Sequence, residues 1–396
     1  MDVKNIAATS IDKYATELQK LSKEIWENPE LAYKEFRAHD VIADFLEKYG
    51  FKVTRKYKLE TAFLAECDFG GGASPHVAVL CEYDALPGIG HACGHNLIAE
   101  VGVATGIAIK EALESCGSTV GKLSVIGTPA EEGMCGKADL IKEGVFDCVD
   151  VAMMAHPSQF TLTRTKYTSM IPVTIIYQGR ASHAASYPWE GLNALDAAVM
   201  CYNAISCLRQ QMKPTWRAHG VIRRGGLQPN VTPDETELEF YLRTPSETEL
   251  KVLKDKVVDC INGAALCTGC KAEYKFGEKH YQALITNEVM AKLFDDNGAR
   301  VGLEFEQREE IKQKFGGSTD MGNVSHVVPS IHPKFDIGTT ASNHSKDFTV
   351  AAGKDFAQVN TLKIAKALAM TALDIYTQSE LLTKIQEEFK RNVPTT

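Results

Sequence analysis

Apolar residues recur at helical spacing over the first fifty positions of the chain. From Ile11 they stand three or four positions apart, so we predict a helix that Ser10 caps and that ends before Pro29. A second amphipathic pattern begins at Phe36 and stops at Gly50, a residue suited to the position that follows a helix C-terminus. The N-terminal part of the chain is therefore predicted to be helical.

Beyond this point, short apolar runs of strand length alternate with helical patterns. The first two runs flank the turn Gly70-Gly71-Gly72, and we expect them to pair as a β-hairpin. Buried strands that alternate with helices are typical of an α/β sheet with helices on both faces. The strand runs are 61–67, 76–81, 123–126 and 151–154, and the helical patterns are 101–113 and 138–143.

From residue 171 the order of the elements changes. The patterns predict a strand, a long helix, two strands, a second helix and a last strand, which is the β-α-β-β-α-β order of a ferredoxin-like α+β unit. Patterns of the first kind resume at Asn287. We therefore predict an inserted domain over 169–285 within a mixed-sheet α/β domain formed by 1–168 and 286–396. The elements of the insert are predicted at 172–177, 192–212, 218–222, 235–242, 246–262 and 272–277.

The charge and cysteine content of the chain restrict its partners and its compartment. The 396 residues include 43 Lys and Arg against 51 Asp and Glu, a formal net charge of −8, which argues against nucleic acid or an anionic membrane as a partner. No stretch approaches about eighteen consecutive apolar residues, and the N-terminus lacks the pattern of a secretory signal. The eleven cysteines, an odd number scattered through apolar segments, indicate reduced thiols, so we expect a cytoplasmic protein.

Three of the predicted strands are followed by side chains that are common metal ligands. Cys93 and His95 follow the second strand run, and a thiolate with an imidazole suits zinc. Glu131 and Glu132 follow the third run, where one carboxylate can bind a metal while its neighbour holds a water. His156 comes after the fourth run.

Each of these signals is weak when it is taken singly, because each is more often found without a metal. Neighbouring strands of an α/β sheet bring the loops at their carboxyl ends together, so three such signals at three strand ends predict one shared metal site. A ligand from the C-terminal part of the chain is still needed, and His326, His332 and His344 are the candidates.

Six short motifs occur in order along the chain. They are Asn28-Pro29-Glu30-Leu31, Asp84-Ala85-Leu86-Pro87, His91-Ala92-Cys93-Gly94-His95, Pro129-Ala130-Glu131-Glu132-Gly133, Gly179-Arg180-Ala181-Ser182-His183-Ala184-Ala185 and Gly191-Leu192-Asn193-Ala194. Over nearly the whole chain, the sequence resembles the aminoacylase/carboxypeptidase superfamily of binuclear metallo-amidohydrolases. Within it, the segments at 317–325 and 365–374 look most like the Xaa-Arg dipeptidase (β-alanyl-lysine dipeptidase) group.

The resemblance implies a pair of divalent ions, zinc or manganese, with Glu131 as the general base. The chain departs from the superfamily at Glu82, where many members have a histidine, so we assign neither Glu82 nor Asp84 as a ligand. Asn96 stands where an aspartate is common after the last histidine of the motif. The ligands that the resemblance implies are Cys93, His95, Glu132, His156 and His344.

The inserted domain is implied to be a lid and a dimerisation module, which predicts a homodimer. His183 is implied to reach the active site of the partner subunit and to stabilise the oxyanion there. Asn230 and Arg243 match residues that hold the oxyanion and the substrate carboxylate, for which a guanidinium fork is suited. Gly317 is placed with them in the predicted substrate-binding set.

The implied activity is hydrolysis of an amide or peptide bond in a dipeptide with a basic C-terminal residue, of the Xaa-Arg, Xaa-Lys or β-alanyl-lysine type. Hydroxide generated at the ions attacks, and Glu131 moves the proton. The alternative hydrolase acts on N-acyl or aminobenzoyl amino acids. Two interpretations from other classes are a metal-stabilised binding protein without catalysis and a thiol redox protein that uses Cys267 and Cys270, which lack a thioredoxin-like context.

Overall fold

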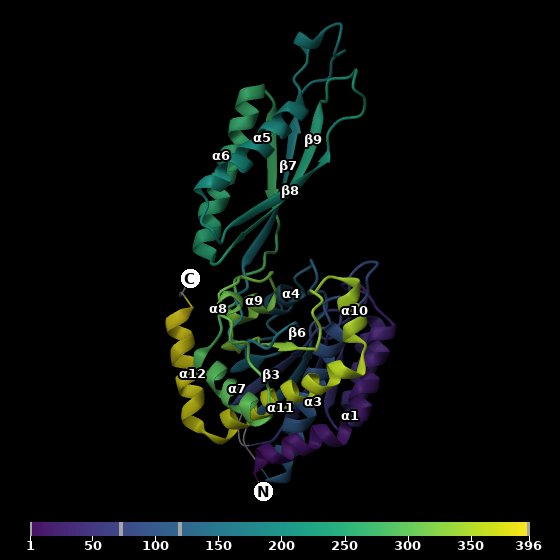
Figure 1. Cartoon of the computed structure of the whole chain (residues 1–396), viewed down its shortest axis with the longest axis vertical. Coiled ribbons are helices and arrows are strands. Elements are labelled where there is room, and N and C mark those ends of the chain that lie inside the picture. Colours follow the sequence, from purple (N-terminus) through teal and green to yellow (C-terminus); the bar gives the residue numbers. More distant parts are fainter. Residues whose placement is uncertain (1, 71–73, 118–120, 394–396) are drawn as a thin grey trace. The chain divides into compact units, whose positions relative to one another are not determined.

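The structure is a computed structural model of the chain that describes residues 2–70, 74–117 and 121–393. It divides into two compact units, called unit 1 and unit 2 (Figure 1). Unit 2 consists of one long segment of the chain and one short segment that comes much later. Unit 1 comprises Met1–Thr165, Leu284–Lys314 and Asp320–Thr396, and unit 2 comprises Lys166–Ala283 and Phe315–Thr319.

Unit 1 is built on a six-stranded mixed sheet with β3 (His76–Cys81) near its centre. All residues of β3 are buried, as in a strand that is covered on both faces. It pairs in parallel with β4 (Lys122–Gly127) along one edge and with β5 (Val151–Met153) along the other. β2 (Phe63–Asp68) pairs antiparallel with the far edge of β4. The sheet order is β1-β2-β4-β3-β5-β11, with β1 at Lys52–Arg55 and β11 at Ser330–Ile331.

The predicted hairpin between residues 61–67 and 76–81 is wrong. Both strands form, but β4 lies between β2 and β3, so these two strands do not pair with each other. A buried central strand needs hydrogen-bonding partners along both of its edges, and β4 and β5, which come later in the chain, supply them. Gly70 of the predicted turn is described, whereas Gly71 and Gly72 lie outside the described residues.

Helices cover both faces of this sheet, as predicted. On one face, α3 (His95–Ser115) lies against β3 and β4 and is covered in turn by α1 (Val3–Glu27) and α11 (Asp355–Thr377). The close approach of α3 depends on Gly102, because a Cβ there would meet Cys81 Sγ at 2.3 Å. The helix that carries His95 is thus held tightly against the sheet.

The opposite face of the sheet is covered by shorter elements. α4 (Gly136–Lys142) and α9 (Met321–Ser325) supply Leu140 and Val324 to an apolar cluster that includes Leu80 of β3. The sheet is therefore buried on both sides, which explains why its central strands are largely apolar rather than alternating.

The first helix begins earlier than predicted. The Asp2 side chain accepts a hydrogen bond from the Lys4 amide at 3.1 Å, so α1 begins at Val3 and Ser10 is a buried residue inside it. Aspartate and serine are equally good capping residues, and Ala7, which is fully buried, extends the apolar face of the helix back past Ser10.

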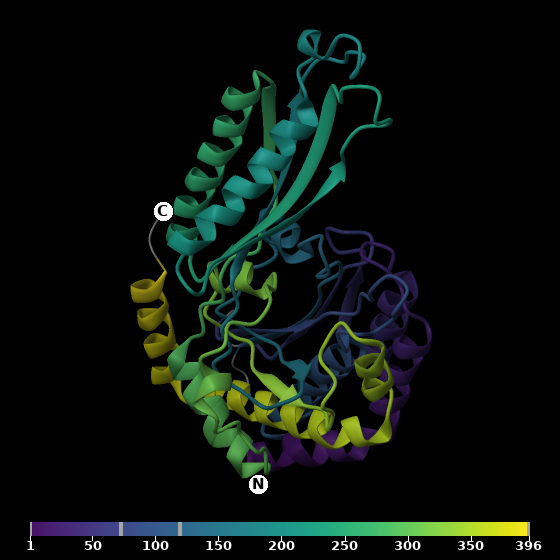
Figure 2. The same cartoon turned by 45° about the horizontal axis from the view of Figure 1, so that its top comes forward.

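Unit 2 is a ferredoxin-like α+β unit, as predicted. Its sheet is antiparallel in the order β10-β7-β9-β8, and the two helices lie side by side over it (Figures 1 and 2). Its apolar core includes Ile175, Phe240 and Leu253, all fully buried. In chain order the elements are β7 (Ser169–Gln178), α5 (Ala194–Leu208), β8 (Arg217–Arg224), β9 (Glu235–Thr244), α6 (Glu247–Thr268) and β10 (Lys271–Phe276).

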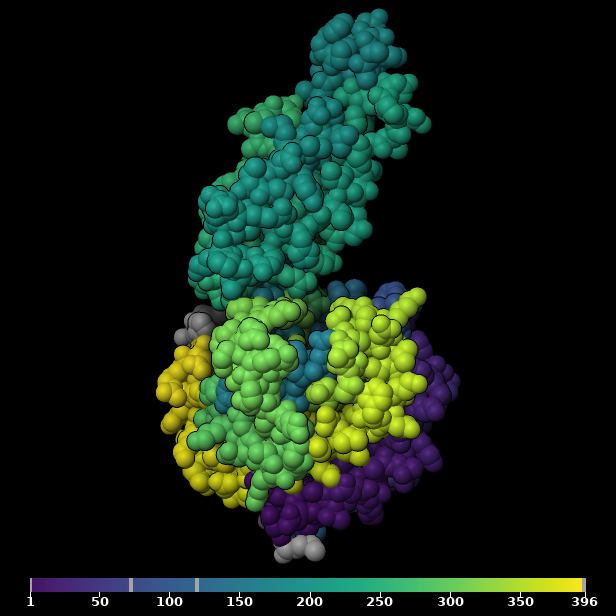
Figure 3. Space-filling view, in the orientation of Figure 1, coloured from purple at the N-terminus to yellow at the C-terminus, as the bar shows by residue number. Residues whose placement is uncertain are grey.

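The remaining elements are short or peripheral. In the space-filling view, the C-terminal part of the chain, coloured green to yellow, forms much of the visible face of unit 1 (Figure 3). None of the helices in the described part of the chain is long and apolar enough to cross a membrane. These elements are α2 (Phe36–Lys48), β6 (His156–Ser158), η1 (Pro188–Glu190), η2 (Arg209–Gln211), α7 (Glu288–Arg300), α8 (Glu309–Lys312), β12 (Lys334–Asp336), α10 (Lys346–Ala352) and α12 (Ser379–Asn392).

Candidate metal centre

The predicted metal ligands of unit 1 lie in the segments that follow three parallel strands. β3 is parallel to both β4 and β5, so the carboxyl ends of all three strands lie at one edge of the sheet. The segment after β4 carries Glu131 and Glu132, and His156 is the first residue of β6, which comes directly after β5. The strand ends therefore bring these side chains toward one place, which is the arrangement that the sequence predicted.

Cys93 and His95 lie where the chain enters α3. Gly94 between them has a left-handed backbone with φ +78°, and a Cβ there would lie 2.6 Å from Pro157 Cγ. Only glycine permits both this conformation and this approach to β6. The approach brings Cys93 Sγ to 3.3 Å from His156 Nε2.

His344 reaches the same place from the segment before α10. Its backbone has φ +65°, which is unusual for a residue with a side chain and is often found at functional sites. Its amide donates a hydrogen bond of 2.8 Å to Ala92 O, and its Nε2 lies 3.3 Å from Glu132 Oε1. Of the other two histidines that the sequence left open, His332 packs against His156 with ring centroids 5.7 Å apart, and His326 lies at the end of α9.

The ligand atoms form overlapping groups in which all atoms lie within 4.8 Å of one another. His95 Nε2 and Glu132 Oε1 are buried and make no hydrogen bond within the described part of the chain, as is expected of atoms that bind a cation. Thiolate, imidazole and carboxylate ligands fit zinc, and the oxygen ligands also suit manganese. The residues present thus fit a pair of divalent ions. Three of the groups are Cys93–His95–His156, Cys93–Glu132–His344 and His95–Glu131–Glu132.

The environment of two of these residues favours metal binding. Burial, together with the neighbouring His332 and His95, holds the pKa of His156 well below its usual value, so its imidazole is neutral, as a ligand must be. Its Nδ1 lies 2.8 Å from Pro157 O, which leaves Nε2 facing Cys93. Burial and the charge of Glu132 raise the pKa of Cys93 well above its usual value, so a thiolate there needs a cation beside it.

Asp84, which we did not assign as a ligand, holds two of the predicted ligands in place. His95 Nδ1 lies 3.0 Å from Asp84 Oδ1, and the Glu132 amide donates to Asp84 Oδ2 at 2.8 Å. Burial by itself would raise the pKa of Asp84, but the charge and hydrogen bond of His95 and the Glu132 amide hold it below its usual value. A carboxylate behind a histidine ligand fixes the tautomer and the orientation of the ring.

Glu131 is buried among other carboxylates. Burial, followed by the charges of Glu82 and Glu132, raises the pKa of Glu131 well above its usual value. The turn before it is fixed by Glu35, a buried residue whose Oε1 accepts a hydrogen bond of 2.9 Å from the Ala130 amide. Ala130 itself has φ +61°, a strained conformation that this hydrogen bond helps to hold.

Lys137 was not singled out from the sequence, although it lies next to this cluster. Its Nζ donates to Glu82 Oε1 at 2.5 Å and to Asp320 Oδ1 at 2.7 Å, and all three side chains are fully buried. Lysine is almost never fully buried unless it is paired, so a lysine at the start of a predicted helix is expected to be exposed. The sequence therefore gave no sign that Lys137 lies among buried carboxylates. Asp320 lies within the segment 317–325 that carried the resemblance but was given no role, and nothing in the sequence marked Glu35 as a support of the turn before Glu131.

Two of the predicted substrate-binding residues lie together in unit 2. Arg243 on β9 donates from Nη1 to Ser318 Oγ at 2.9 Å, and Gly317 O accepts a hydrogen bond of 3.0 Å from the Thr168 amide. Burial lowers the pKa of Arg243, and among the described residues its guanidinium contacts His219 Nε2 and Ser318 Oγ but no carboxylate. The guanidinium is therefore suited to bind the carboxylate of an incoming molecule.

His183 and Asn230 lie together elsewhere in unit 2. Both residues are exposed, and the Ala184 amide donates to Asn230 O at 3.0 Å, which joins the two segments. The ring of His183 is oriented by the Ala185 amide, which donates to Nδ1 at 3.3 Å. That these side chains reach a metal centre stays a prediction.

Comparison with known proteins assigns the chain to a family. Residues 169–266 match the M20 peptidase dimerisation domain. The chain is 49% identical over 397 residues to the Xaa-Arg dipeptidase of Homo sapiens, with 97% of this chain and 91% of that protein covered. The chain belongs to the M20 peptidase family. The resemblance to the metallo-amidohydrolase superfamily is thereby confirmed, and with it the assignment of the chain to the metal-dependent hydrolases.

Two more distant proteins of the M20 family extend the comparison. The chain is 29% identical over 445 residues to a p-aminobenzoyl-glutamate hydrolase component of Escherichia coli (strain K12), with 94% of this chain and 91% of that protein covered. A crystal structure of a dinuclear metal binding peptidase of the M20 family from Bacillus subtilis aligns with a TM-score of 0.68 at 20% identity. That alignment covers 92% of this chain and 99% of the other and shows a common fold.

The position of Asp84 generates a prediction about metal affinity. An asparagine at residue 84 has one acceptor oxygen and one NH₂ group, so it cannot accept hydrogen bonds from both His95 and the Glu132 amide. We expect Asp84→Asn to weaken metal binding by roughly 10–100-fold, measured as the metal Kd by competition with a chelator. Asp147→Asn, which changes an exposed aspartate of the same unit, serves as the control and should leave the Kd unchanged. An unaltered Kd in Asp84→Asn contradicts the role of Asp84.

Proposed function

We propose that this protein hydrolyses the amide bond of a dipeptide with a basic C-terminal residue, of the Xaa-Arg, Xaa-Lys or β-alanyl-lysine type. The observation that carries the proposal is the convergence of thiol, imidazole and carboxylate ligand atoms beside the buried carboxylate of Glu131. The 49% identity to a protein named for Xaa-Arg dipeptides supports the choice of substrate class.

In this proposal, two divalent cations, zinc or manganese, are held by five side chains of unit 1. When bound, such ions lower the pKa of water toward about 7 and polarise the carbonyl of the amide. Cys93 and His95 each belong to two of the ligand groups, which supports a pair of ions rather than one. The five proposed ligands are Cys93, His95, Glu132, His156 and His344.

Glu131 is the proposed general base. Its carboxylate takes a proton from the attacking water and returns it to the nitrogen of the leaving amine, a role that contributes about 10²–10⁴-fold to the rate. Burial and the neighbouring carboxylates raise its pKa, which makes it a stronger base than an exposed glutamate. The bond between Glu35 and the Ala130 amide holds the turn that aims it.

The residues of unit 2 are proposed to bind the substrate and to stabilise the oxyanion. Arg243 supplies a guanidinium without a carboxylate partner among the described residues, and Ser318, which it contacts, is next to Gly317. We assign Arg243 and Gly317 to the substrate carboxylate, and Asn230 and His183 to the oxyanion that forms as the carbonyl is attacked.

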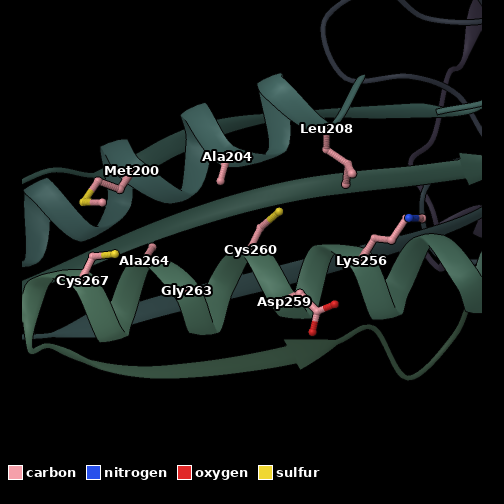
Figure 4. Close-up of a pocket in the computed structure, with 9 residues that line it drawn as sticks. All are labelled: Met200, Ala204, Leu208, Lys256, Asp259, Cys260, Gly263, Ala264 and Cys267. Atoms are coloured by element: carbon pink, nitrogen blue, oxygen red, sulfur yellow. The ribbon is translucent and has the colours of Figure 1, made fainter. Parts of the chain in front are cut away.

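A homodimer formed through unit 2 is part of the proposal. The match of residues 169–266 to a dimerisation domain supports it. A groove between α5 and α6 offers an apolar surface whose lining includes Met200, Leu208, Cys260 and Ala264 (Figure 4). No disulfide joins any of the eleven cysteines in the described part of the chain, which supports a reducing compartment such as the cytoplasm.

The second candidate function is hydrolysis of an N-acyl or aminobenzoyl amino acid, supported by the 29% identity to a component of a p-aminobenzoyl-glutamate hydrolase. A panel of dipeptides and N-acyl amino acids, assayed on protein stripped of metal and then reloaded with zinc or manganese, separates the two. We expect no turnover in the stripped protein and, after reloading, preference for β-alanyl-lysine and Xaa-Arg dipeptides. Turnover of N-acyl amino acids alone favours the second candidate, and equal turnover with and without metal contradicts both.

Glu131→Gln tests the general base. Glutamine keeps the size of the side chain but cannot take a proton from water, so we expect kcat to fall at least about a hundredfold. The metal content, measured by mass spectrometry, should stay at the wild-type value because the proposed ligands are intact. Glu143→Gln, at an exposed glutamate of the same unit, is the control. Near-normal kcat in Glu131→Gln removes this residue from the proposed mechanism.

His183→Ala tests the contribution of the partner subunit. Loss of the imidazole removes stabilisation of the oxyanion, so we expect kcat to fall by about 10²–10³-fold. Mixed dimers of His183→Ala and Glu131→Gln subunits contain one site with both residues intact, so mixing two inactive proteins should restore part of the activity. His280→Ala, at another histidine of unit 2, should remain active. Mixed dimers that stay inactive count against action between subunits.

A further inference from the structure

One buried carboxylate beside the predicted ligands has no part in the proposed function. Glu82 follows β3 directly, and its side chain is fully buried. Its Oε1 accepts a hydrogen bond of 2.5 Å from Lys137 Nζ, whereas its Oε2 makes no hydrogen bond within the described part of the chain. Burying a carboxylate oxygen that makes no hydrogen bond costs free energy of folding. The role of Glu82 therefore depends on the atom that Oε2 faces.

Glu82 Oε2 faces a nitrogen of the metal centre. It lies 3.5 Å from His95 Nε2, and this nitrogen also makes no hydrogen bond to a described residue. Two ligand atoms that each lie about 2.0–2.1 Å from one tetrahedral ion are roughly 3.4 Å apart. The two buried atoms therefore have the separation of two ligands of one ion.

The other nitrogen of His95 supports this interpretation. His95 Nδ1 pairs with Asp84 Oδ1 at 3.0 Å, and a neutral imidazole that donates from Nδ1 has a lone pair on Nε2. When His95 is neutral, as a metal ligand must be, Glu82 Oε2 and His95 Nε2 are two acceptors that face each other with no donor between them. A divalent cation satisfies both atoms at once.

Lys137 explains the orientation of Glu82. Its Nζ contacts Glu82 Oε1 and Asp320 Oδ1, and its amide donates to Asp320 Oδ2 at 2.9 Å. The oxygens of Glu82, Glu131 and Asp320 also form a group spaced to hold a cation, and the ammonium of Lys137 supplies the positive charge of that group. Glu82 thus uses one oxygen for the lysine and keeps the other directed toward His95.

We propose that Glu82 is a further metal ligand, which binds through Oε2 the same ion as His95, and that Lys137 is the positioning residue that fixes it. The inference rests on the proposed function only in that this centre binds divalent ions. It adds a sixth side chain to the five ligands of that proposal and gives a role to a buried lysine that touches neither ion nor substrate.

Glu82→Gln is the direct test, with metal binding as its readout. The amide keeps an acceptor for Lys137 but loses the charge that binds the cation. We expect the Kd of one of the two ions, measured by competition with a chelator, to rise at least about tenfold while the other is unchanged. In protein loaded with Co²⁺, the d–d absorption should change for one ion, because its set of ligands changes.

Asp320→Asn is the matched control for the loss of charge. It removes a carboxylate that pairs with the same lysine but forms no ion pair with His95 in the described part of the chain, so we expect wild-type Kd values and an unaltered Co²⁺ spectrum. An effect as large as that of Glu82→Gln means that the charge of the cluster matters rather than a ligand atom, and overturns the inference.

Lys137→Met tests the positioning role. Without the ammonium, Glu82 is no longer held, so we expect weaker binding of the same ion that Glu82→Gln affects. The Lys137→Met/Glu82→Gln double variant should bind that ion no more weakly than Glu82→Gln alone, because both changes act through one oxygen. Additive losses show a general structural role for Lys137 and contradict its assignment.

The remaining outcomes separate this inference from the proposed function. Wild-type Kd values and spectrum in Glu82→Gln mean that Glu82 only pairs with a protonated His95, which overturns the inference and leaves the five-ligand centre intact. Failure of the wild-type protein to bind two ions overturns both. If circular dichroism shows that Glu82→Gln is unfolded, Glu82→Asp replaces it: the charge is kept but the oxygen retracts from His95, and the same rise in Kd is expected.

Discussion

The structure depends on the burial of several carboxylates at the carboxyl ends of the strands of unit 1. Glu82, Asp84, Glu131 and Asp320 are all buried there, and a buried charge is stable only with a counter-charge or hydrogen bonds. Lys137 balances part of this charge, and hydrogen bonds from His95 and the Glu132 amide hold Asp84. The divalent ions of the proposed function complete the balance, so folding of unit 1 and metal binding are expected to be coupled.

Close packing fixes the positions of these charged side chains. Glycine at residue 102 lets α3 lie against β3, and glycine at residue 94 lets the loop before that helix reach Pro157. The contact at Gly102 sets how closely α3 approaches the sheet, and the contact at Gly94 sets the distance between Cys93 and His156. Ligand geometry is thus decided by backbone contacts that involve no charged group, because a densely packed interior transmits small displacements.

The local patterns of the sequence predicted most of the elements. The six elements of unit 2 and the helices on both faces of the sheet in unit 1 are found, since periodicity of apolar positions reflects which face each segment buries. The pairing of strands was not predictable in the same way. β4 enters between β2 and β3 from a later part of the chain, and the stability of that order depends on contacts that no local pattern contains.

The apolar runs of the sequence marked the buried strands and the residues that follow them. Because parallel strands end on the same side of a sheet, this pattern was enough to predict that Cys93, His95, Glu131, Glu132 and His156 meet. The residue pattern left three histidines open for the last ligand, and only the resemblance implied His344. Only the tertiary structure placed His344 against Glu132 and gave Asp84, Lys137 and Glu35 their partners. These contacts join residues far apart in the chain or depend on the direction of a buried side chain, which the folded core alone decides.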